Sequence, residues 1–262
     1  MTASEPAPIR ATIAQLDPER GNVAANCKTI CDTLAAAAAV DTDIVVFPEL
    51  ALTGYHIQND VDALTDRAEQ ALAEILPHTT DMVVVLGTPT TGPAAPYNAA
   101  VVLEDEERVG AYEKTHLYGV EQPTFASGST YPTFETSIGT IGVEICYDLE
   151  FPEVARQLAM NGADLLVTIS ANMRPCELDQ DTYHRARALE NAIPHILCNR
   201  VGTERGEDYF GASGVVNARG RRVLSVGEDQ AVTTTIEIPT GVEFEKAHAY
   251  LEDRRPETYS LD

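Results

Sequence analysis

The chain has 262 residues, 44% of them hydrophobic, and a formal net charge of −23. This length suits one large α/β domain, and we predict a single domain over residues 1–262. Scattered acidic charge would repel a phosphate backbone, which argues against nucleic-acid binding. No apolar run reaches the roughly 18 residues of a membrane-spanning helix, and the amino terminus lacks a signal-peptide layout, so we expect a cytoplasmic protein without membrane contact.

The large negative charge also suggests that the protein works at high salt concentration. The acidic residues are spread along a chain of ordinary hydrophobicity, which argues against disorder. Dissolved salt screens the mutual repulsion of such charges, so we hypothesise a halophilic source. Lysine is scarce in this chain and occurs only at Lys28, Lys114 and Lys246. A lysine beside an apolar segment, as at position 114, is therefore notable.

The first half of the chain alternates strand-like and helix-like segments. We predict strands over residues 8–15, 43–47, 82–87, 97–103 and 107–112. Between them we predict helices over residues 22–40 and 61–76.

The second half continues the alternation and then becomes strand-rich. We predict strands over residues 138–145, 164–170, 195–200, 214–217, 222–226 and 232–238. Helices are predicted over residues 152–161, which begins with a proline, and 179–192. Short apolar strands separated by amphipathic helices indicate mixed sheets covered by helices, and the late strands favour two packed sheets. The polar tail over residues 241–262 is predicted to be an arm that packs on a partner subunit.

Cys146 is the first candidate for chemistry. A strand-like run ends at this residue, and a helix-like run begins about five residues later. A nucleophile placed at such a turn is exposed at the end of a sheet. The alternative is a buried cysteine, which is the interpretation we prefer for Cys27, Cys31 and Cys198. The spacing of the cysteines suits neither a disulfide framework nor a zinc site, and no metal is expected.

Glu49 and Lys114 occupy similar positions at the edges of apolar segments. Amide hydrolysis needs a strong nucleophile, a proton carrier and a positive group for the developing oxyanion. Cys146, Glu49 and Lys114 could supply these three functions. A nearby lysine and a helix amino terminus are expected to stabilise the cysteine thiolate. The alternatives are a turn-capping carboxylate for Glu49 and a solvated strand-end lysine for Lys114.

Three short segments together resemble one family. Residues 47–50, 112–117 and 145–148 read FPEL, YEKTHL and ICYD. They resemble the signature blocks of the nitrilase, or carbon–nitrogen hydrolase, superfamily in order and in spacing. The resemblance extends from about Ile9 to the tail. It implies a four-layer αββα sandwich, a Glu49–Lys114–Cys146 triad, a thioester acyl-enzyme, no cofactor, and a homodimer or a higher homo-oligomer.

The resemblance also bears on further residues. Glu121 matches an additional acidic residue found in many members, which positions the substrate or holds the catalytic geometry. The backbone N–H of Tyr147 is expected to be a second oxyanion donor. Tyr55 is a candidate for the pocket wall, and Asn172 could hold the substrate or the catalytic loop. Arg187 and Glu190 lie three residues apart on a helix, where a structural ion pair is the simpler interpretation.

One departure guides the choice of activity. Many relatives have an arginine shortly after the ICYD block, whereas residues 149–153 here read LEFPE. This version, with SANM at residues 170–173, resembles the branch of aliphatic and amino-acid amide hydrolases. We therefore expect an amidase for a small amide. The alternatives are an N-carbamoyl amino acid or ureidopropionate hydrolase, with Arg174 as the substrate carboxylate's partner, a nitrilase, and a catalytically inactive binding protein.

Overall fold

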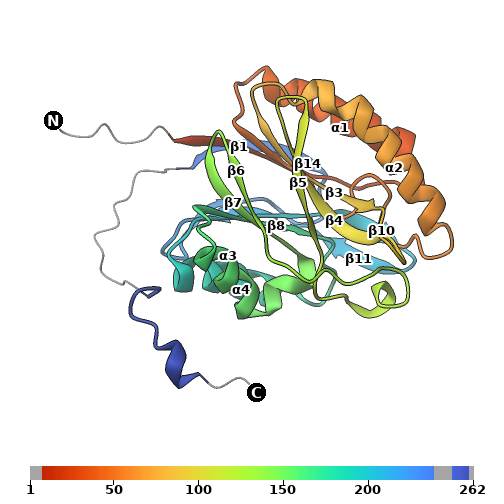
Figure 1. Cartoon of the computed structure of the whole chain (residues 1–262). Helices are drawn as coiled ribbons and strands as arrows, with labels where there is room; N and C mark the ends of the chain where they lie inside the picture. Colours follow the sequence, from red (N-terminus) through yellow and green to blue (C-terminus); the bar gives the residue numbers. More distant parts are fainter. Residues whose placement is uncertain (1–7, 239–249, 260–262) are drawn as a thin grey trace.

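Two six-stranded mixed sheets lie face to face at the centre of the molecule, and a pair of helices covers each outer face (Figure 1). The computed structural model describes residues 8–238 and 250–259. The predicted α/β architecture with four αββα layers is confirmed. In each sheet three parallel strands form the centre and antiparallel strands form the edges.

The two sheets take their strands from different halves of the chain. The first sheet has the order β14 (Val232–Ile238), β1 (Ile9–Gln15), β2 (Ile44–Val46), β3 (Val83–Thr90), β4 (Tyr97–Glu104) and β5 (Glu107–Glu113). The second has the order β13 (Arg222–Ser225), β12 (Gly214–Val216), β9 (His195–Asn199), β8 (Leu165–Ser170), β7 (Gly139–Ile145) and β6 (Thr133–Thr136). Only β14 belongs by sequence to the other half of the chain.

The helices α1 (Val23–Ala38) and α2 (Val61–Ile75) cover the first sheet, whereas α3 (Pro152–Met160) and α4 (Glu177–Asn191) cover the second (Figure 1). The helices α1, α2 and α3 bury mainly apolar side chains on their sheets, whereas the buried face of α4 is largely polar. Short 3-10 turns add η1 (Leu76–His78), η2 (Gly119–Glu121), η3 (Cys146–Glu150) and η4 (Pro256–Thr258). No helix within the described ranges is long and apolar enough to cross a membrane.

Alternation along each central strand divides the core into layers. In β2, Ile44 and Val46 point into the core between the sheets, whereas Val45 packs with the residues of α1 and α2. Because both faces of these strands are buried, they read as continuous apolar runs. Each such side chain contributes roughly 1.5–3 kcal/mol when it is fully buried. The strands that carry the candidate site are therefore held rigidly from both sides.

The sequence analysis missed three strands, β6 and the hairpin of β10 (Val201–Glu204) and β11 (Glu207–Phe210). The β6 segment reads TFET, which is too short and too polar for a clear period. The hairpin turns at Arg205 and Gly206, both with positive φ, as two-residue hairpin turns require. The charged residues of this hairpin obscure the apolar alternation that predicts a strand, although Gly206 does indicate a turn.

Part of the predicted carboxyl-terminal arm lies outside the described residues, namely 241–249 and 260–262. Within residues 250–259, Arg254 contacts Met160 of α3 through a donor–sulfur distance of 2.6 Å. A role for this arm in subunit contacts, and the assignment of residues 1–262 to one domain, stay predictions.

Candidate active site

The candidate residues gather where strands of both sheets end. Glu49 follows β2, Lys114 follows β5, Cys146 follows β7, and Asn172 follows β8. Because β7 and β8 are neighbouring parallel strands, their carboxyl ends lie at the same edge of the second sheet, and the hydrogen bond from the Ala171 N–H brings Glu49, which follows β2, to this edge. The sequence thus places the candidate site at the boundary between the two sheets.

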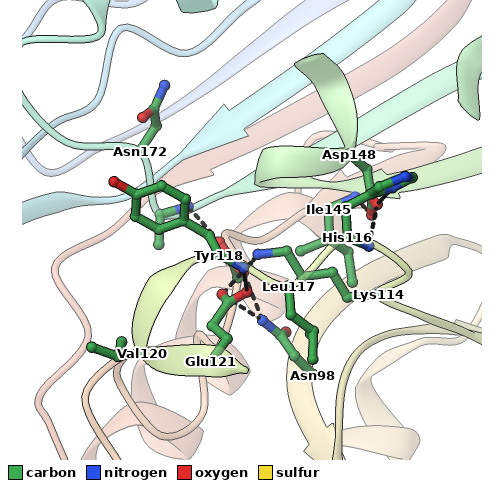
Figure 2. Close-up of polar contacts among 12 residues, drawn as sticks. Asn98, Lys114, His116, Leu117, Tyr118, Val120, Glu121, Ile145, Asp148 and Asn172 are labelled. Carbon is green, nitrogen blue, oxygen red and sulfur yellow. Dashed lines mark hydrogen bonds and ion pairs between the residues drawn. The ribbon is translucent and has the colours of Figure 1, made fainter. Parts of the chain in front are cut away.

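Lys114 lies between two carboxylates in a fully buried cluster (Figure 2). Its Nζ donates to Glu49 Oε1 and to Glu121 Oε1, at 2.7 Å each. All three side chains are 0–1% exposed. An ammonium has three hydrogens, so two of them are used here and one can serve another acceptor. The structure therefore brings together Glu49, Lys114 and Glu121.

Two further donors hold this cluster, and sequence analysis missed both. Asn98 of β4 donates through Nδ2 to Glu49 Oε1 at 2.7 Å and to Glu121 Oε1 at 3.2 Å. The backbone N–H of Ala171 donates to Glu49 Oε2 at 2.8 Å and thereby links the two sheets. An asparagine inside an otherwise apolar strand was the available signal for Asn98. The Ala171 contact depends on how the sheets pack and leaves no mark in the sequence.

Burial decides the protonation of the cluster. It raises the pKa of Glu49 above the usual carboxyl range, and the charge of Glu121 raises it further, while Lys114 and Asn98 act in the opposite direction. Burial alone would lower the pKa of Lys114, but the charges of Glu121 and Glu49 outweigh it and raise that pKa. Lys114 is therefore a stable cation beside a carboxylate that binds protons more readily than an exposed one.

Cys146 opens η3 directly after β7, with φ at 48° in the left-handed region. A non-glycine residue in this region is uncommon and marks a backbone held by its surroundings. Burial raises the pKa of the Cys146 thiol, and the Glu49 charge adds to the rise, while Lys114 and Ser170 oppose it. The balance keeps the resting group a neutral thiol. Lys114 favours the thiolate, but burial and the Glu49 charge oppose it, which favours a mechanism in which a separate base takes the thiol proton.

Asp148 fixes the turn that carries Cys146, and it was not singled out from the sequence. Its Oδ2 accepts from the Ile145 backbone N–H at 3.1 Å and from the Tyr112 hydroxyl at 2.8 Å. Its Oδ1 accepts from the Thr115 hydroxyl at 2.9 Å and from the His116 backbone N–H at 3.0 Å. One buried carboxylate therefore joins the cysteine turn to the segment that follows Lys114 (Figure 2).

Replacing Asp148 by asparagine should loosen this junction. The amide Nδ2 would face hydrogen-bond donors, so the free energy of unfolding should fall by about 2–4 kcal/mol. Misplacement of Cys146 relative to Lys114 should lower kcat/KM by about 10²-fold. Chemical denaturation and steady-state kinetics measure the two effects. Asp164→Asn is the matched control, because Asp164 is exposed and accepts from the Thr140 backbone N–H outside the site. Equal effects in both variants would contradict this role.

Two backbone features position Glu49, a left-handed residue directly after it and a close approach by a neighbouring strand. Leu50, the next residue, has φ at 49°. Gly87 of β3 packs directly on this segment, and a Cβ there would lie 2.3 Å from Pro48 O and 2.7 Å from Glu49 Cα. Only glycine allows this approach. The side chain of Glu49 is therefore aimed by backbone packing as well as by its hydrogen bonds.

The structure places the two tyrosines differently. Tyr55 is buried, and its pKa is raised well above the usual range by burial and by the charges of Glu121 and Glu49. Tyr55 therefore lies close to the cluster, and its role as a pocket wall stays a prediction. Tyr147 is half-buried and packs edge-to-face with Tyr118 and Phe151, at centroid distances of 5.4 and 5.0 Å. Its side chain belongs to an aromatic rim, and the oxyanion role of its N–H stays a prediction.

Asn172 lies apart from the lysine cluster (Figure 2). Its backbone N–H donates to Asn199 Oδ1 at 2.8 Å, and its Oδ1 accepts from the Met173 N–H at 3.0 Å. These bonds support a role in holding the loop after β8. The predicted helical ion pair is confirmed, since Arg187 contacts Glu190 at 3.1 Å. Arg187 also donates to the Leu149 and Glu150 carbonyls and so holds η3.

The donor set of this cluster does not suit a metal ion. Within the described ranges, no group of three or more His, Cys, Asp or Glu residues is arranged to hold a metal ion. The cluster instead combines a buried ammonium, two carboxylates and a cysteine at a constrained turn. That set can transfer protons and form a covalent bond to a substrate.

Comparison with known proteins gives a consistent answer. Residues 10–243 match the model of the carbon-nitrogen hydrolase family. A probable nitrilase of Schizosaccharomyces pombe is 33% identical over 229 residues, covering 83% of this chain and 84% of the relative. An (R)-stereoselective amidase of a Pseudomonas species is 30% identical over 249 residues, covering 93% and 90%.

This chain is also similar to a solved structure of an amidase. A mutant of the amidase from Nesterenkonia sp. AN1 is 25% identical, with a TM-score of 0.87 and 98% coverage of both chains. In that mutant the acetamide moiety of fluoroacetamide is covalently added to the active-site cysteine. The sandwich and the site therefore define a hydrolase that acts on carbon–nitrogen bonds other than peptide bonds. The chain belongs to the carbon–nitrogen hydrolase family.

Proposed function

We propose that the protein is a thiol amidase that converts a small amide to a carboxylic acid and ammonia. The observation that carries the proposal is the buried Lys114 held between Glu49 and Glu121, beside a cysteine at a left-handed turn. A neutral thiol needs a base, and a carboxylate with a raised pKa is suited to that task at neutral pH.

The proposed reaction has two halves. Glu49 takes the thiol proton of Cys146 as the sulfur attacks the carbonyl carbon, and the C=O bond becomes an oxyanion. Lys114 and the Tyr147 N–H stabilise this oxyanion. The carbon–nitrogen bond then breaks, and ammonia leaves with the proton from Glu49. Water attacks the thioester, gives a proton to Glu49, and releases the acid as the proton returns to sulfur.

Glu121 and Asn98 are proposed to hold this arrangement. Both contact Glu49 or Lys114 directly, and neither needs to touch the reacting atoms. Asn172 and Tyr55 are proposed to shape the pocket. The names of the relatives support the reaction class, since the amidases among them act on amides.

Arg174 is poorly suited to the carbamoylase alternative. Its guanidinium contacts Glu177 and is bonded to Asp208 at 3.1 Å, Glu228 at 3.1 Å and Asp229 at 2.8 Å. With four carboxylates around it, this arginine has no free donor pair for a substrate carboxylate. The amidase proposal is therefore preferred over a ureido hydrolase that relies on Arg174.

Ammonia release from a panel of small aliphatic amides, the matching nitriles and N-carbamoyl amino acids tests the proposal. We expect turnover of amides and none of the other two classes. Turnover of carbamoyl compounds alone would replace the amidase by a ureido hydrolase, and turnover of nitriles alone would replace it by a nitrilase. If no compound of the panel releases ammonia and Cys146 also fails to react with iodoacetamide, an inactive binding protein would be favoured.

The pH dependence should depend on Glu121. Because Glu49 must be ionised in the free enzyme, kcat/KM should rise with pH through the pKa of Glu49, above the ordinary glutamate value of about 4.3. The Glu121 charge raises that pKa, so Glu121→Gln should move the acidic limb of the profile to lower pH. Glu113→Gln, one residue from Lys114, should leave the limb in place. If the acidic limb of the kcat/KM profile has the same midpoint in Glu121→Gln as in the wild type, Glu49 is excluded as the titrating base.

The halophilic surface is likewise a proposal. Screening of 23 net negative charges should raise the thermal unfolding midpoint as sodium chloride is increased, because the Debye length falls from about 10 Å at 0.1 M to about 3 Å at 1 M. Circular dichroism melts across this range measure the effect. A midpoint that is equal or lower at molar salt would refute the proposal.

A further inference from the structure

A cavity lies between α4 and the strands β12 and β13, and none of its lining residues belongs to the Lys114 cluster. It has a volume of about 220 Å³. On the helix side it is lined by Glu177, Gln180, Asp181 and His184. These residues follow the spacing i, i+3, i+4 and i+7, which places them on one face of the helix. The cavity is therefore built by a continuous polar stripe of α4.

The strand side of the cavity is largely apolar. Alternate residues of one segment, Ala212, Gly214 and Val216, line it, and so do Leu224 and Val226 of the neighbouring strand region. Residues two apart on a strand share one face of the sheet. The cavity thus has a polar wall and an apolar wall, which suits a small ligand with one polar end and a short hydrocarbon part.

The polar wall offers hydrogen-bond acceptors. His184 is 6% exposed, and its Nε2 lies 3.0 Å from the His195 carbonyl, which can only accept, so Nε2 carries the proton. Burial lowers the pKa of His184 to about 4, so the ring is neutral near pH 7 and Nδ1 is an acceptor. No residue of the described ranges bonds to that Nδ1. Gln180 is 4% exposed, and its buried Oε1 has no partner there either.

The charge around the cavity is negative. Its lining includes the carboxylates of Glu177, Asp181 and Glu228, and Glu177 and Glu228 share Arg174 with Asp208 and Asp229. Asp181 contacts Arg222 and lies 4.0 Å from Arg185. Five carboxylates thus face three guanidinium groups. Arg222, the one cation in the lining, is already engaged by Asp181 and the Ser225 hydroxyl.

We propose that this cavity is a binding site for a small aliphatic primary ammonium ion. Its N–H groups would meet the acceptors of Gln180, His184 and Glu228, and its hydrocarbon chain would lie on the apolar wall. A chelated metal fits less well, since within residues 8–238 and 250–259 no metal-binding group of His, Cys, Asp or Glu forms. The proposal concerns a site separate from the Lys114 cluster and does not depend on the amidase reaction.

Calorimetric titration of the full chain with n-butylammonium chloride, at an ionic strength fixed with sodium chloride, tests the site. We expect saturable binding with one site per chain, no binding of n-butanol, and weaker binding of tetramethylammonium, which has no N–H. An absence of saturable heat, or equal binding of tetramethylammonium, would overturn the proposal.

Three variants locate the site. Glu228→Gln should weaken butylammonium binding about tenfold, since a charge-assisted hydrogen bond is lost. Leu224→Trp should fill the cavity and abolish binding. Asp66→Asn removes one exposed carboxylate of α2 and should leave binding unchanged. Glu228 is exposed, so its variant should fold normally. Binding that survives both Glu228→Gln and Leu224→Trp, or that falls equally in Asp66→Asn, would place the ligand elsewhere.

Discussion

Cys146→Ala should remove turnover of the amide substrate while leaving the fold intact. The variant loses the atom that attacks the carbonyl, and the remaining donors cannot form an acyl-enzyme, so kcat should fall by at least about 10⁴-fold. Removal of one partly buried sulfur from a turn costs little packing, and the far-UV circular dichroism and the unfolding midpoint should be unchanged.

The measurement should include a direct search for the intermediate. Intact-mass spectrometry of the acid-quenched wild-type enzyme with substrate should show the added acyl group, and Cys146→Ala should not. Cys31→Ala is the control, because Cys31 is a half-buried free cysteine on α1 outside the site. An active Cys146→Ala enzyme, or an acyl group that persists in it, would assign the nucleophile to another residue.

Lys114→Met should damage both stability and catalysis. Two carboxylates would stay buried without their cation, and breaking a buried ion pair in this way costs about 3–5 kcal/mol of unfolding free energy. The oxyanion would also lose its positive partner, which should lower kcat by about 10²–10³-fold or more. Denaturant titration and steady-state kinetics at the same pH measure the two losses.

A double variant separates the two effects of Lys114. Combining Lys114→Met with Glu121→Gln removes one uncompensated charge, so stability should recover in part while activity stays low. Lys28→Met is the matched control, because Lys28 is exposed on α1 and pairs only with Asp32 among the described residues. Recovery of activity along with stability would mean that Lys114 acts through folding alone.

Glu49, Lys114 and Cys146 could be predicted from the sequence because each lies where an apolar segment ends. Glu49 and Cys146 end apolar strands, and Lys114 is one of only three lysines. The alternation of strand and helix periods predicted mixed sheets covered by helices and favoured two packed sheets, whereas the four-layer αββα order was implied by the resemblance to the family. Three coordinated blocks then linked these positions to one family.

Other parts of the site depend on contacts that no local pattern records. Asn98 reaches Glu49 only because β4 pairs with β3 in one register. The raised pKa of the Cys146 thiol follows from the groups that the fold packs around it, which its position in the chain does not reveal. The cavity on α4 requires residues roughly 30 to 50 positions apart in the chain to face each other. The register of paired strands and the burial of a side chain are set only when the chain has folded.

The hydrogen bond from the Ala171 N–H to Glu49 has a consequence for how activity is lost on heating. It joins a residue that follows the second sheet's β8 to one that follows the first sheet's β2. A compact, molten state could keep both sheets and their far-UV signal while the packing between them loosens. In such a state Glu49, the proposed base, would no longer be held in position to take the proton of Cys146. Thermal inactivation should therefore precede the loss of secondary structure, and enzymatic activity would act as a sensor of sheet-to-sheet docking.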